Sequence, residues 1–393
     1  MRVDAIKDKV AIIGMGCTRF GENWDQSVDY MVIDAAYEAF ADAKIETKDV
    51  EAAWVGTIGS GITGMTIGGP LKLRQMPITR IENACATGMD ALRNASFSVA
   101  CGLYDIVLIV GVEKLKDTGF GGLPEFFSHP VYGQGFTAPG RWALGATRYF
   151  QAHGIKPEDG KTALAKIAVK NHRNGSLSPK AHFQREITLE QALKAPIIAW
   201  PLGLFDCCPT TDGAAAAIIC RADMARSFKD DYILVKGFGL AMGPGLGKED
   251  IDYRYDCLPE TIAAGKQAYD AVGIKNPRKE ISLAQLHDCF TIAELLEYEA
   301  LGFCGPGKAL LEEVDAGTFT LEGELPVNTD GGLKAFGHPI GATGLRMCYE
   351  LYNQLLGKAG PRQIKNPQLG LAMAQGGHPG NLMPIVTILG RKD

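Results

Sequence analysis

One cysteine and three histidines stand where strands are expected to end. Cys85 lies in "IENACATGMDALRNASFSV", between the alternating segment 78–81 and a helix that the spacing of small and apolar residues predicts directly after it. His287 ("LAQLHDCF"), His338 ("GLKAFGHPIGATG") and His378 ("AMAQGGHPGN") each follow a predicted strand or lie in a glycine-rich loop. In open α/β sheets ligands bind outside the carboxyl ends of the strands, so these positions predict one shared site.

A thiol with nearby imidazoles is suited to acyl transfer. A helix N-terminus favours thiolate over thiol, and a nearby histidine can take the thiol proton or hold the thiolate. A thioester substrate then needs donors aimed at the oxyanion that develops on its carbonyl, and chemistry at its α-carbon needs a proton acceptor or donor. A free cysteine is usually a buried hydrophobe, so it is the set of four residues that favours a catalytic site.

The composition is that of an ordinary globular enzyme. The chain has 393 residues, of which 46% are hydrophobic and 22% charged, and this length favours two domains. The net charge of −5 and the absence of a basic run exclude a nucleic-acid-binding class. Without a signal-like start, a long apolar segment or a CxxC pair among the ten cysteines, we expect a reduced, cytoplasmic protein that binds no membrane and no metal.

The predicted elements occur twice in a similar order. Strands and helices alternate over the first 115 residues, and a similar β-α-β sequence returns after about Asp231. We therefore expect two copies of one unit, residues 1–231 and 232–393. The irregular segment 115–201 breaks the rhythm of the first copy and is expected to be an insertion.

The insertion carries a cluster of basic side chains that could meet the phosphates of an anionic substrate. Its members are Lys170, His172, Arg173, Lys180 and Arg185. The alternative is a solvated surface, which is the commoner fate of such clusters.

Six motifs in the same order resemble the thiolase family, in the branch of the thiolase domain of sterol carrier protein 2 and its archaeal and bacterial relatives. They are "VAIIGMGCTRFG", "ENACATGMDALRNA", "VKNHRNG", "DCCPTTDGAAA", "HDCFTIAE" and "GGLKAFGHPIGATG". The resemblance implies an α/β thiolase fold, with two pseudo-repeated βαβαβαββ halves in five layers (α-β-α-β-α) and a loop domain inserted in the first half.

The resemblance also implies roles for the four residues. Cys85 matches the acyl-accepting nucleophile, and His338 the histidine that activates it, so we expect His338 to lower the pKa of Cys85. His287 matches a contributor to an oxyanion hole. The Cys85 N–H and one from the loop between Gly377 and Gly380 would form a second oxyanion hole.

One position departs from the family. Most thiolases have a second cysteine in the last glycine loop, where it moves the α-carbon proton, but the best-aligned residue here is Gln375. We expect His378 to take over this proton transfer, because imidazole has a suitable pKa and the amide does not. The alternatives are Cys289, a bound water, or a loop shaped for an unusual substrate.

The resemblance implies CoA-dependent cleavage of a 3-oxoacyl-CoA, or the reverse condensation, through an acyl-cysteine. The substrate is expected to be bulky or aromatic, such as benzoylsuccinyl-CoA. The alternatives are an acetoacetyl-CoA-forming acetyl-CoA acetyltransferase, a β-ketoacyl synthase-like condensing enzyme, or a non-enzymatic scaffold. The segments "SHPVYGQG", "FTAPGRW" and "AWPLGLF" are expected to line the acyl pocket or to belong to the core.

Coenzyme A enters as substrate, and its expected contacts are Arg173, Lys180, Gly377 and Gly380. The expected partners are a second copy, as a homodimer or dimer of dimers, and a small zinc-ribbon/OB-fold subunit of the DUF35 type. Zinc is expected outside this chain, whose cysteines and histidines show no ligand spacing.

Overall fold

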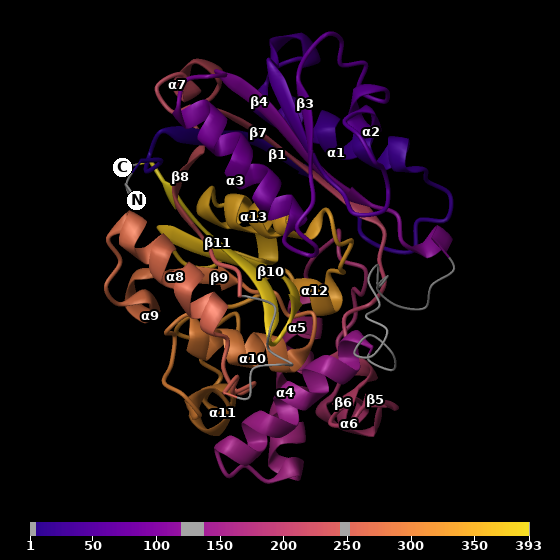
Figure 1. Cartoon of the computed structure of the whole chain (residues 1–393), viewed down its shortest axis with the longest axis vertical. Helices are drawn as coiled ribbons and strands as arrows, with labels where there is room; N and C mark the ends of the chain where they lie inside the picture. The colour runs from indigo at the N-terminus through magenta and orange to yellow at the C-terminus, as the bar shows by residue number, and fades with distance from the viewer. Residues whose placement is uncertain (1–4, 119–136, 244–251, 393) are drawn as a thin grey trace.

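A computed structural model describes residues 5–118, 137–243 and 252–392 (Figure 1). Over these residues nine strands form one mixed sheet in the order β3-β2-β4-β7-β1-β8-β11-β10-β9. The first five strands in the chain order of this sheet are β1 (Val10–Cys17), β2 (Ala52–Gly56), β3 (Ile78–Ile81), β4 (Ile106–Glu113) and β7 (Gly213–Arg221). The other four are β8 (Ile233–Leu240), β9 (Leu283–Gln285), β10 (Leu369–His378) and β11 (Asn381–Arg391).

The strand order reads similarly from both edges toward the β1–β8 seam. In the N-terminal half β2 is parallel to β3 and β4, β4 is antiparallel to β7, and β7 to β1. In the C-terminal half β9 is parallel to β10, β10 is antiparallel to β11, and β11 to β8. A parallel bridge from Val327 to Ala284 takes the place of β3. The predicted repeat of one α/β unit is therefore present in the fold.

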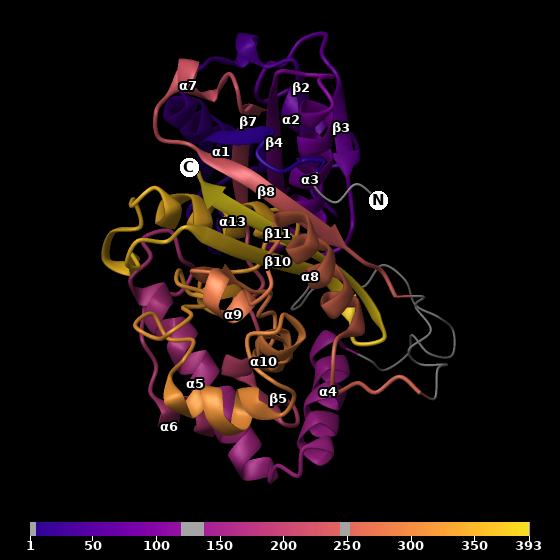
Figure 2. The ribbon, with the colours of Figure 1, turned by 90° about the vertical axis from the view of Figure 1, so that its left-hand side faces the viewer.

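Helices cover and separate the two halves of the sheet. α1 (Val28–Ala43) packs on β1 and β7, and α8 (Pro259–Val272) packs on β8 and β11. Between them lie α3 (Thr87–Ala100) and α13 (Thr343–Leu355), which contact each other and strands of both halves (Figures 1 and 2). The order α1, sheet, α3 with α13, sheet, α8 confirms the five-layer prediction.

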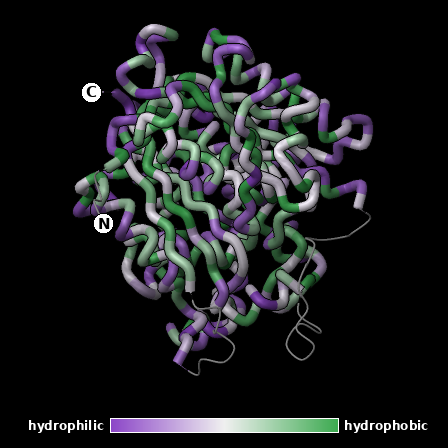
Figure 3. Tube along the Cα trace, turned by 45° about the horizontal axis from the view of Figure 1, so that its top comes forward, coloured by the Kyte–Doolittle hydropathy of each residue, from purple (hydrophilic) through white to green (hydrophobic). Residues whose placement is uncertain are grey.

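Sequence signals explain the outer helices. The Ser27 side chain accepts a hydrogen bond from the Tyr30 N–H and caps α1, and Lys44 in the left-handed region ends it. Apolar residues along the strands are buried between the layers, and hydrophilic segments lie mostly at the periphery (Figure 3). Among the described residues no helix has the length and hydrophobicity needed to cross a bilayer.

The remaining elements are short or lie in the lower part of the view in Figure 1. The longer ones are α4 (Ala138–Ala152), α5 (Pro157–Ser176), α6 (Leu189–Lys194) and α10 (Thr291–Ala300). The short ones are α2 (Met65–Gly68), β5 (Ile197–Ala199), β6 (Leu202–Gly203), α7 (Ala225–Phe228), α9 (Pro277–Glu280), α11 (Val314–Ala316), α12 (Gly332–Ala335), the 3₁₀ turns Thr47–Asp49, Lys116–Thr118, Leu204–Asp206 and Gly360–Arg362, and the π-turn Ala309–Glu313. α5 packs against α10 and α12 and so connects the segment 115–201 to the C-terminal half.

Three sequence expectations need comment. His378 was expected after a strand, in a glycine-rich loop, but it is the last residue of β10. Of the expected acyl-pocket segments, "SHPVYGQG" lies outside the described residues. In "FTAPGRW" the Trp142 ring is buried and packs against Phe290, so this part belongs to the core.

Glycines join the two halves at the N-termini of α3 and α13. A Cβ on Gly88 or Gly111 would lie 2.5 or 2.4 Å from the Gly341 carbonyl oxygen, and one on Gly341 would lie 2.7 Å from the Gly56 oxygen. The N–H of Gly341 also donates to the buried Glu113 carboxylate at 3.2 Å. Because the obstructing atoms are backbone, no side-chain movement can make room. This approach sets the distance between the segments that carry Cys85 and His338.

We expect Gly341→Ala to destabilise the fold and to separate the two segments. Overpacking in a dense core costs about 1–3 kcal/mol, and more where backbone has to move. Thermal unfolding and thiol acylation should both be impaired. Gly69→Ala is the control, because the nearest atom to its Cβ would be 3.6 Å away. Equal stability and acylation in the two variants would mean that the glycine contact is dispensable.

Candidate active site

Cys85 follows a strained turn between β3 and α3. Ala84 has a φ of +47°, which costs a residue with a Cβ about 1–3 kcal/mol. Side chains hold this turn: the Thr87 hydroxyl donates to the Ala84 carbonyl at 2.5 Å and accepts from the Asn83 N–H at 2.8 Å. The Ala84 N–H donates to the Glu82 carboxylate at 2.5 Å. The turn therefore places Cys85 in a fixed position at the N-terminus of α3.

The structure brings Cys85 together with two of the three predicted histidines. One ligand atom each of Cys85, His287 and His338 lie within 4.8 Å of one another, and the two imidazole rings meet edge to face with centroids 5.1 Å apart. Both histidines are buried. Sulfur and imidazole nitrogen are also ligands that zinc prefers, but the expectation that this chain holds no metal stays a prediction.

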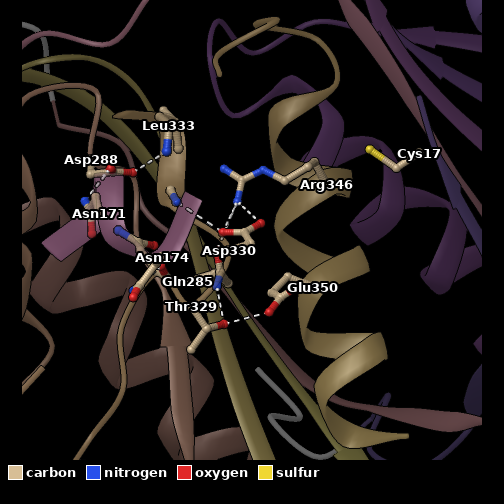
Figure 4. A network of polar contacts seen from close by, with 12 residues as sticks. Cys17, Asn171, Asn174, Gln285, Asp288, Thr329, Asp330, Leu333, Arg346 and Glu350 are labelled. Atoms are coloured by element: carbon tan, nitrogen blue, oxygen red, sulfur yellow. Dashed lines mark hydrogen bonds and ion pairs between the residues drawn. The ribbon is translucent and has the colours of Figure 1, made fainter. Parts of the chain in front are cut away.

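Asp288 anchors the segment that carries His287 (Figure 4). Its carboxyl accepts hydrogen bonds from the backbone N–H groups of Leu333 at 2.6 Å and Lys334 at 3.1 Å, and from the Asn171 amide at 2.8 Å. Asp288 directly follows His287, so these hydrogen bonds hold the His287 segment against α12 and α5.

A buried ion pair supports the same segment from the side of α13. Arg346 has no exposed surface and pairs with Asp330 at 2.8 Å (Figure 4). It also donates to the Gln285 side chain at 3.0 Å, two residues before His287. Thr329 links the Gln285 amide to Glu350 on α13. The polar network thus couples β9 to the loop before α12 and to α13.

Thr343 fixes the orientation of the His338 ring. The His338 Nδ1 lies 2.7 Å from the Thr343 Oγ1, and this hydroxyl donates to the Pro339 carbonyl at 3.0 Å. A hydroxyl has one proton, so Nδ1 must carry the hydrogen and donate to Oγ1. The His338 Nε2 is then an acceptor; it is buried and has no hydrogen-bond partner among the described residues. The atom free to take the Cys85 proton is therefore Nε2.

Both imidazoles are neutral in the resting protein. Burial, with a contribution from the Arg346 charge, lowers the pKa of His338 to about 3. Burial, His338 and Arg346 together lower the pKa of His287 well below its ordinary value. Neutral imidazole keeps the lone pair that a general base needs.

The expectation of a lowered Cys85 pKa is wrong. Burial raises the pKa of Cys85 to about 12, and the carboxylates of Glu113 and Glu82 add to the rise. The N-terminus of α3 favours the thiolate, but the cost of removing a charge from water is larger. Cys85 and His338 are therefore a thiol and a neutral imidazole at neutral pH.

His378 lies apart from this cluster, as the last residue of β10. It pairs with Asn381 across the hairpin and is half-buried, and its Nδ1 lies 3.0 Å from the Pro379 carbonyl. Its expected role in moving the α-carbon proton stays a prediction.

The two basic residues expected to hold CoA have acidic partners. Arg173 makes a two-armed ion pair with Glu322, at 2.8 and 2.5 Å, and Lys180 donates to both oxygens of Glu38 at 2.6 Å. These partners compete with phosphate, so an assignment to CoA requires the pairs to open. It stays a prediction.

The glycines expected to help hold CoA lie in the turn between β10 and β11. Gly377 and Gly380 both have positive φ, +91° and +86°, and a Cβ on Gly377 would lie 1.9 Å from the Asn381 oxygen. A Cβ on the preceding Gly376 would lie 3.2 Å from the Cys85 nitrogen. The start of this turn therefore packs directly on the Cys85 backbone.

Sequence reasoning missed Thr343, although a signal for it was present. The tripeptide Ala-Thr-Gly occurs at the start of both central helices, as residues 86–88 and 342–344. Thr87 holds the Cys85 turn and Thr343 holds His338, so the repeat carries two equivalent positioning residues. Glu297, which binds Gln375, was also missed, because the 78 positions between them leave no local pattern.

The fold and the cluster of one cysteine and two buried histidines are those expected of an acyltransferase. The chain belongs to the thiolase family. Residues 10–223 match the N-terminal domain of thiolases, and residues 247–391 match the thiolase C-terminal domain-like family.

Curated relatives agree with this assignment and with the suspected branch. An acetyl-CoA acetyltransferase of Methanothermobacter thermautotrophicus is 37% identical, covering 94% of this chain and 97% of the relative. Sterol carrier protein 2 of Gallus gallus is 34% identical over 91% of this chain and 67% of that protein. The benzoylsuccinyl-CoA thiolase subunit BbsB of Thauera aromatica is 33% identical, covering 95% and 96%.

A solved structure described as the Ltp2-ChsH2(DUF35) aldolase superposes with a TM-score of 0.83. It is 26% identical in sequence and covers 98% of this chain and 99% of the other.

We expect alkylation of Cys85 by iodoacetamide to be slow at neutral pH and to keep rising beyond pH 9. A pKa raised to about 12 leaves few thiolates at pH 7, and each rise in pH increases that fraction. Peptide mass spectrometry measures the rate at Cys85, with the exposed Cys101 as internal reference. A plateau already reached near pH 7 would reveal a resting thiolate–imidazolium pair and contradict the neutral site.

Proposed function

We propose that this protein is a thiolase that cleaves a 3-oxoacyl-CoA with free CoA, or runs the reverse condensation, through an acyl group on Cys85. The observation that carries the proposal is the mutual approach, within 4.8 Å, of Cys85, His287 and His338 in a buried site. A scaffold protein would have no need to hold this set together.

His338 acts as the general base for Cys85. Its Nε2 takes the thiol proton as the sulfur attacks the thioester carbon, and Thr343 accepts from Nδ1 and so stabilises the imidazolium that forms. Because both partners start neutral, this transfer creates charge only when a substrate carbonyl is present to be attacked.

Two sets of donors serve the developing oxyanions. His287 is assigned to one of them, and a positioned donor of this kind typically contributes about 10²–10³ in rate. The Cys85 N–H, with an N–H from the segment 377–380, is assigned to the other. The packing of Gly376 on the Cys85 nitrogen supports this pairing.

The acyl group of the substrate is proposed as bulky or aromatic, in the manner of benzoylsuccinyl-CoA. The similarity to BbsB supports it, and the similarity to acetyl-CoA acetyltransferases supports acetoacetyl-CoA as the second candidate. Arg173, Lys180, Gly377 and Gly380 remain the proposed contacts for CoA.

We propose that the protein works in the cytoplasm as a homodimer or dimer of dimers, with a small DUF35-type subunit as further partner. The similarity to a structure whose description includes a DUF35 chain supports this partner.

Cys85→Ser should abolish cleavage of 3-oxoacyl-CoA esters while leaving the fold intact. Peptide mapping after incubation with a panel that includes acetoacetyl-CoA and benzoylsuccinyl-CoA should find the acyl group on Cys85. Free CoA alone should support cleavage, whereas a β-ketoacyl synthase would need a carrier protein. Acylation of Cys207, Cys208 or Cys289 in place of Cys85 would overturn the assignment.

A further inference from the structure

Glu297 is a fully buried carboxyl that the reaction scheme above does not use. It lies on α10, and its Oε1 accepts a hydrogen bond of 2.7 Å from the Gln375 Nε2. The other carboxyl oxygen and the Gln375 Oε1 are both buried and have no hydrogen-bond partner among the described residues. Two adjacent unsatisfied oxygens in a protein interior call for an explanation, because such groups are costly.

The carboxyl lies between the segments that form the active site. On one side Gln375 precedes Gly376, where an added Cβ would lie 2.9 Å from the Asn83 carbonyl oxygen and 3.2 Å from the Cys85 nitrogen. On the other side the backbone N–H of His287 faces the Glu297 carboxyl. Glu297 is also close enough to Cys289 for the two side chains to interact electrostatically, and Cys289 interacts in the same way with Cys85.

We propose that Glu297, held in place by Gln375, is the acid and base that exchanges protons with the CoA thiol and the substrate α-carbon. The inference rests on the proposed thiolase function and deepens it. Gln375 occupies the position where a proton-transferring cysteine was expected, and although its amide cannot transfer a proton, its hydrogen-bond partner can. Gln375 is then the positioning residue and the unpartnered Glu297 oxygen the reacting atom.

The protons balance in this scheme. In acylation His338 takes the Cys85 proton and keeps it, the bond between carbonyl carbon and CoA sulfur breaks, and the leaving thiolate takes the proton of the Glu297 carboxyl. In condensation the Glu297 carboxylate removes a proton from the α-carbon of a second acyl-CoA. The carbanion attacks the acyl carbon, the bond to the Cys85 sulfur breaks, and His338 returns its proton to that sulfur. Cleavage runs the same steps backward.

The charge state agrees with this order of events. Burial, with the nearby Asp288 and Glu294, raises the pKa of Glu297 well above its ordinary value, which favours the protonated carboxyl that can act as an acid. Burial also raises the pKa of Cys289. For a thiol this shift moves the pKa further above neutral pH, whereas for a carboxyl the same shift moves the pKa toward neutral pH.

The test uses the full chain with Glu297→Gln and two acyl donors. One is an acyl-CoA, whose leaving thiolate needs a proton; the other is an acyl thioester of 5-thio-2-nitrobenzoate, whose leaving thiolate needs none. Acylation of Cys85 should fall about 10²–10⁴-fold with the first donor and stay unchanged with the second. Deuterium exchange at the α-carbon of acyl-CoA should be lost to the same extent.

Controls separate this inference from other outcomes. Glu299→Gln, on the same helix but bonded to Tyr149, should behave as wild type in both assays. Gln375→Leu removes only the hydrogen bond. It should give a smaller loss of Cys85 acylation, again with the acyl-CoA donor only, and it replaces Glu297→Gln in the test if that variant does not fold. Equal slowing with both donors would mean a structural role and overturn the inference. Deuterium exchange at the α-carbon that is normal in Glu297→Gln but lost in His378→Ala would also overturn the inference. Wild-type protein that is not acylated at Cys85 by either donor would instead refute the thiolase function.

Discussion

The close approach of two backbones at Gly341 is the constraint on which the active site depends. Cys85 belongs to the N-terminal half and His338 to the C-terminal half, and they meet because Gly341, just before α13, packs directly on the backbone of the N-terminal half. The Glu113 carboxylate reinforces the contact, since it accepts from N–H groups of residues 58–60 and from Gly341. A side chain at this crossing would separate Cys85 from His338 without touching either residue directly.

Burial at this seam decides the electrostatics of the site. It raises the pKa of Cys85 and lowers that of both histidines, so each group is neutral at rest. The same burial favours the protonated form of Glu297. A neutral resting site avoids the cost of a charge pair in the protein interior.

The sequence revealed most of what local patterns encode. The alternation of residues 78–81 and the helical spacing after Cys85 matched β3 and α3, and the repeated element order matched the two halves. The motifs around Cys85, His287 and His338 identified residues that the fold brings together. His378 was expected in a loop but lies in β10, because this strand stays paired with β11 through Gly376 and Gly377.

What the sequence could not reveal depends on contacts between distant segments. The sign of the Cys85 pKa shift follows from burial between two halves, which a helix N-terminus alone does not show. The sequence around Arg173 and Lys180 contains no sign that these side chains are paired. Their acidic partners are 149 and 142 positions away and become neighbours only in the fold. The pairing of Gln375 with Glu297 is equally non-local.

The central claim is that the Cys85–His338 pair is neutral at rest, with the His338 hydrogen on Nδ1. Nitrogen-15 NMR of protein labelled in its histidines tests this most directly, with His338→Gln to assign the signals. The account predicts a neutral Nδ1–H ring for His338 at pH 7, unchanged in Cys85→Ser and altered in Thr343→Val. An imidazolium signal for His338 in the resting protein, lost in Cys85→Ser, would contradict it.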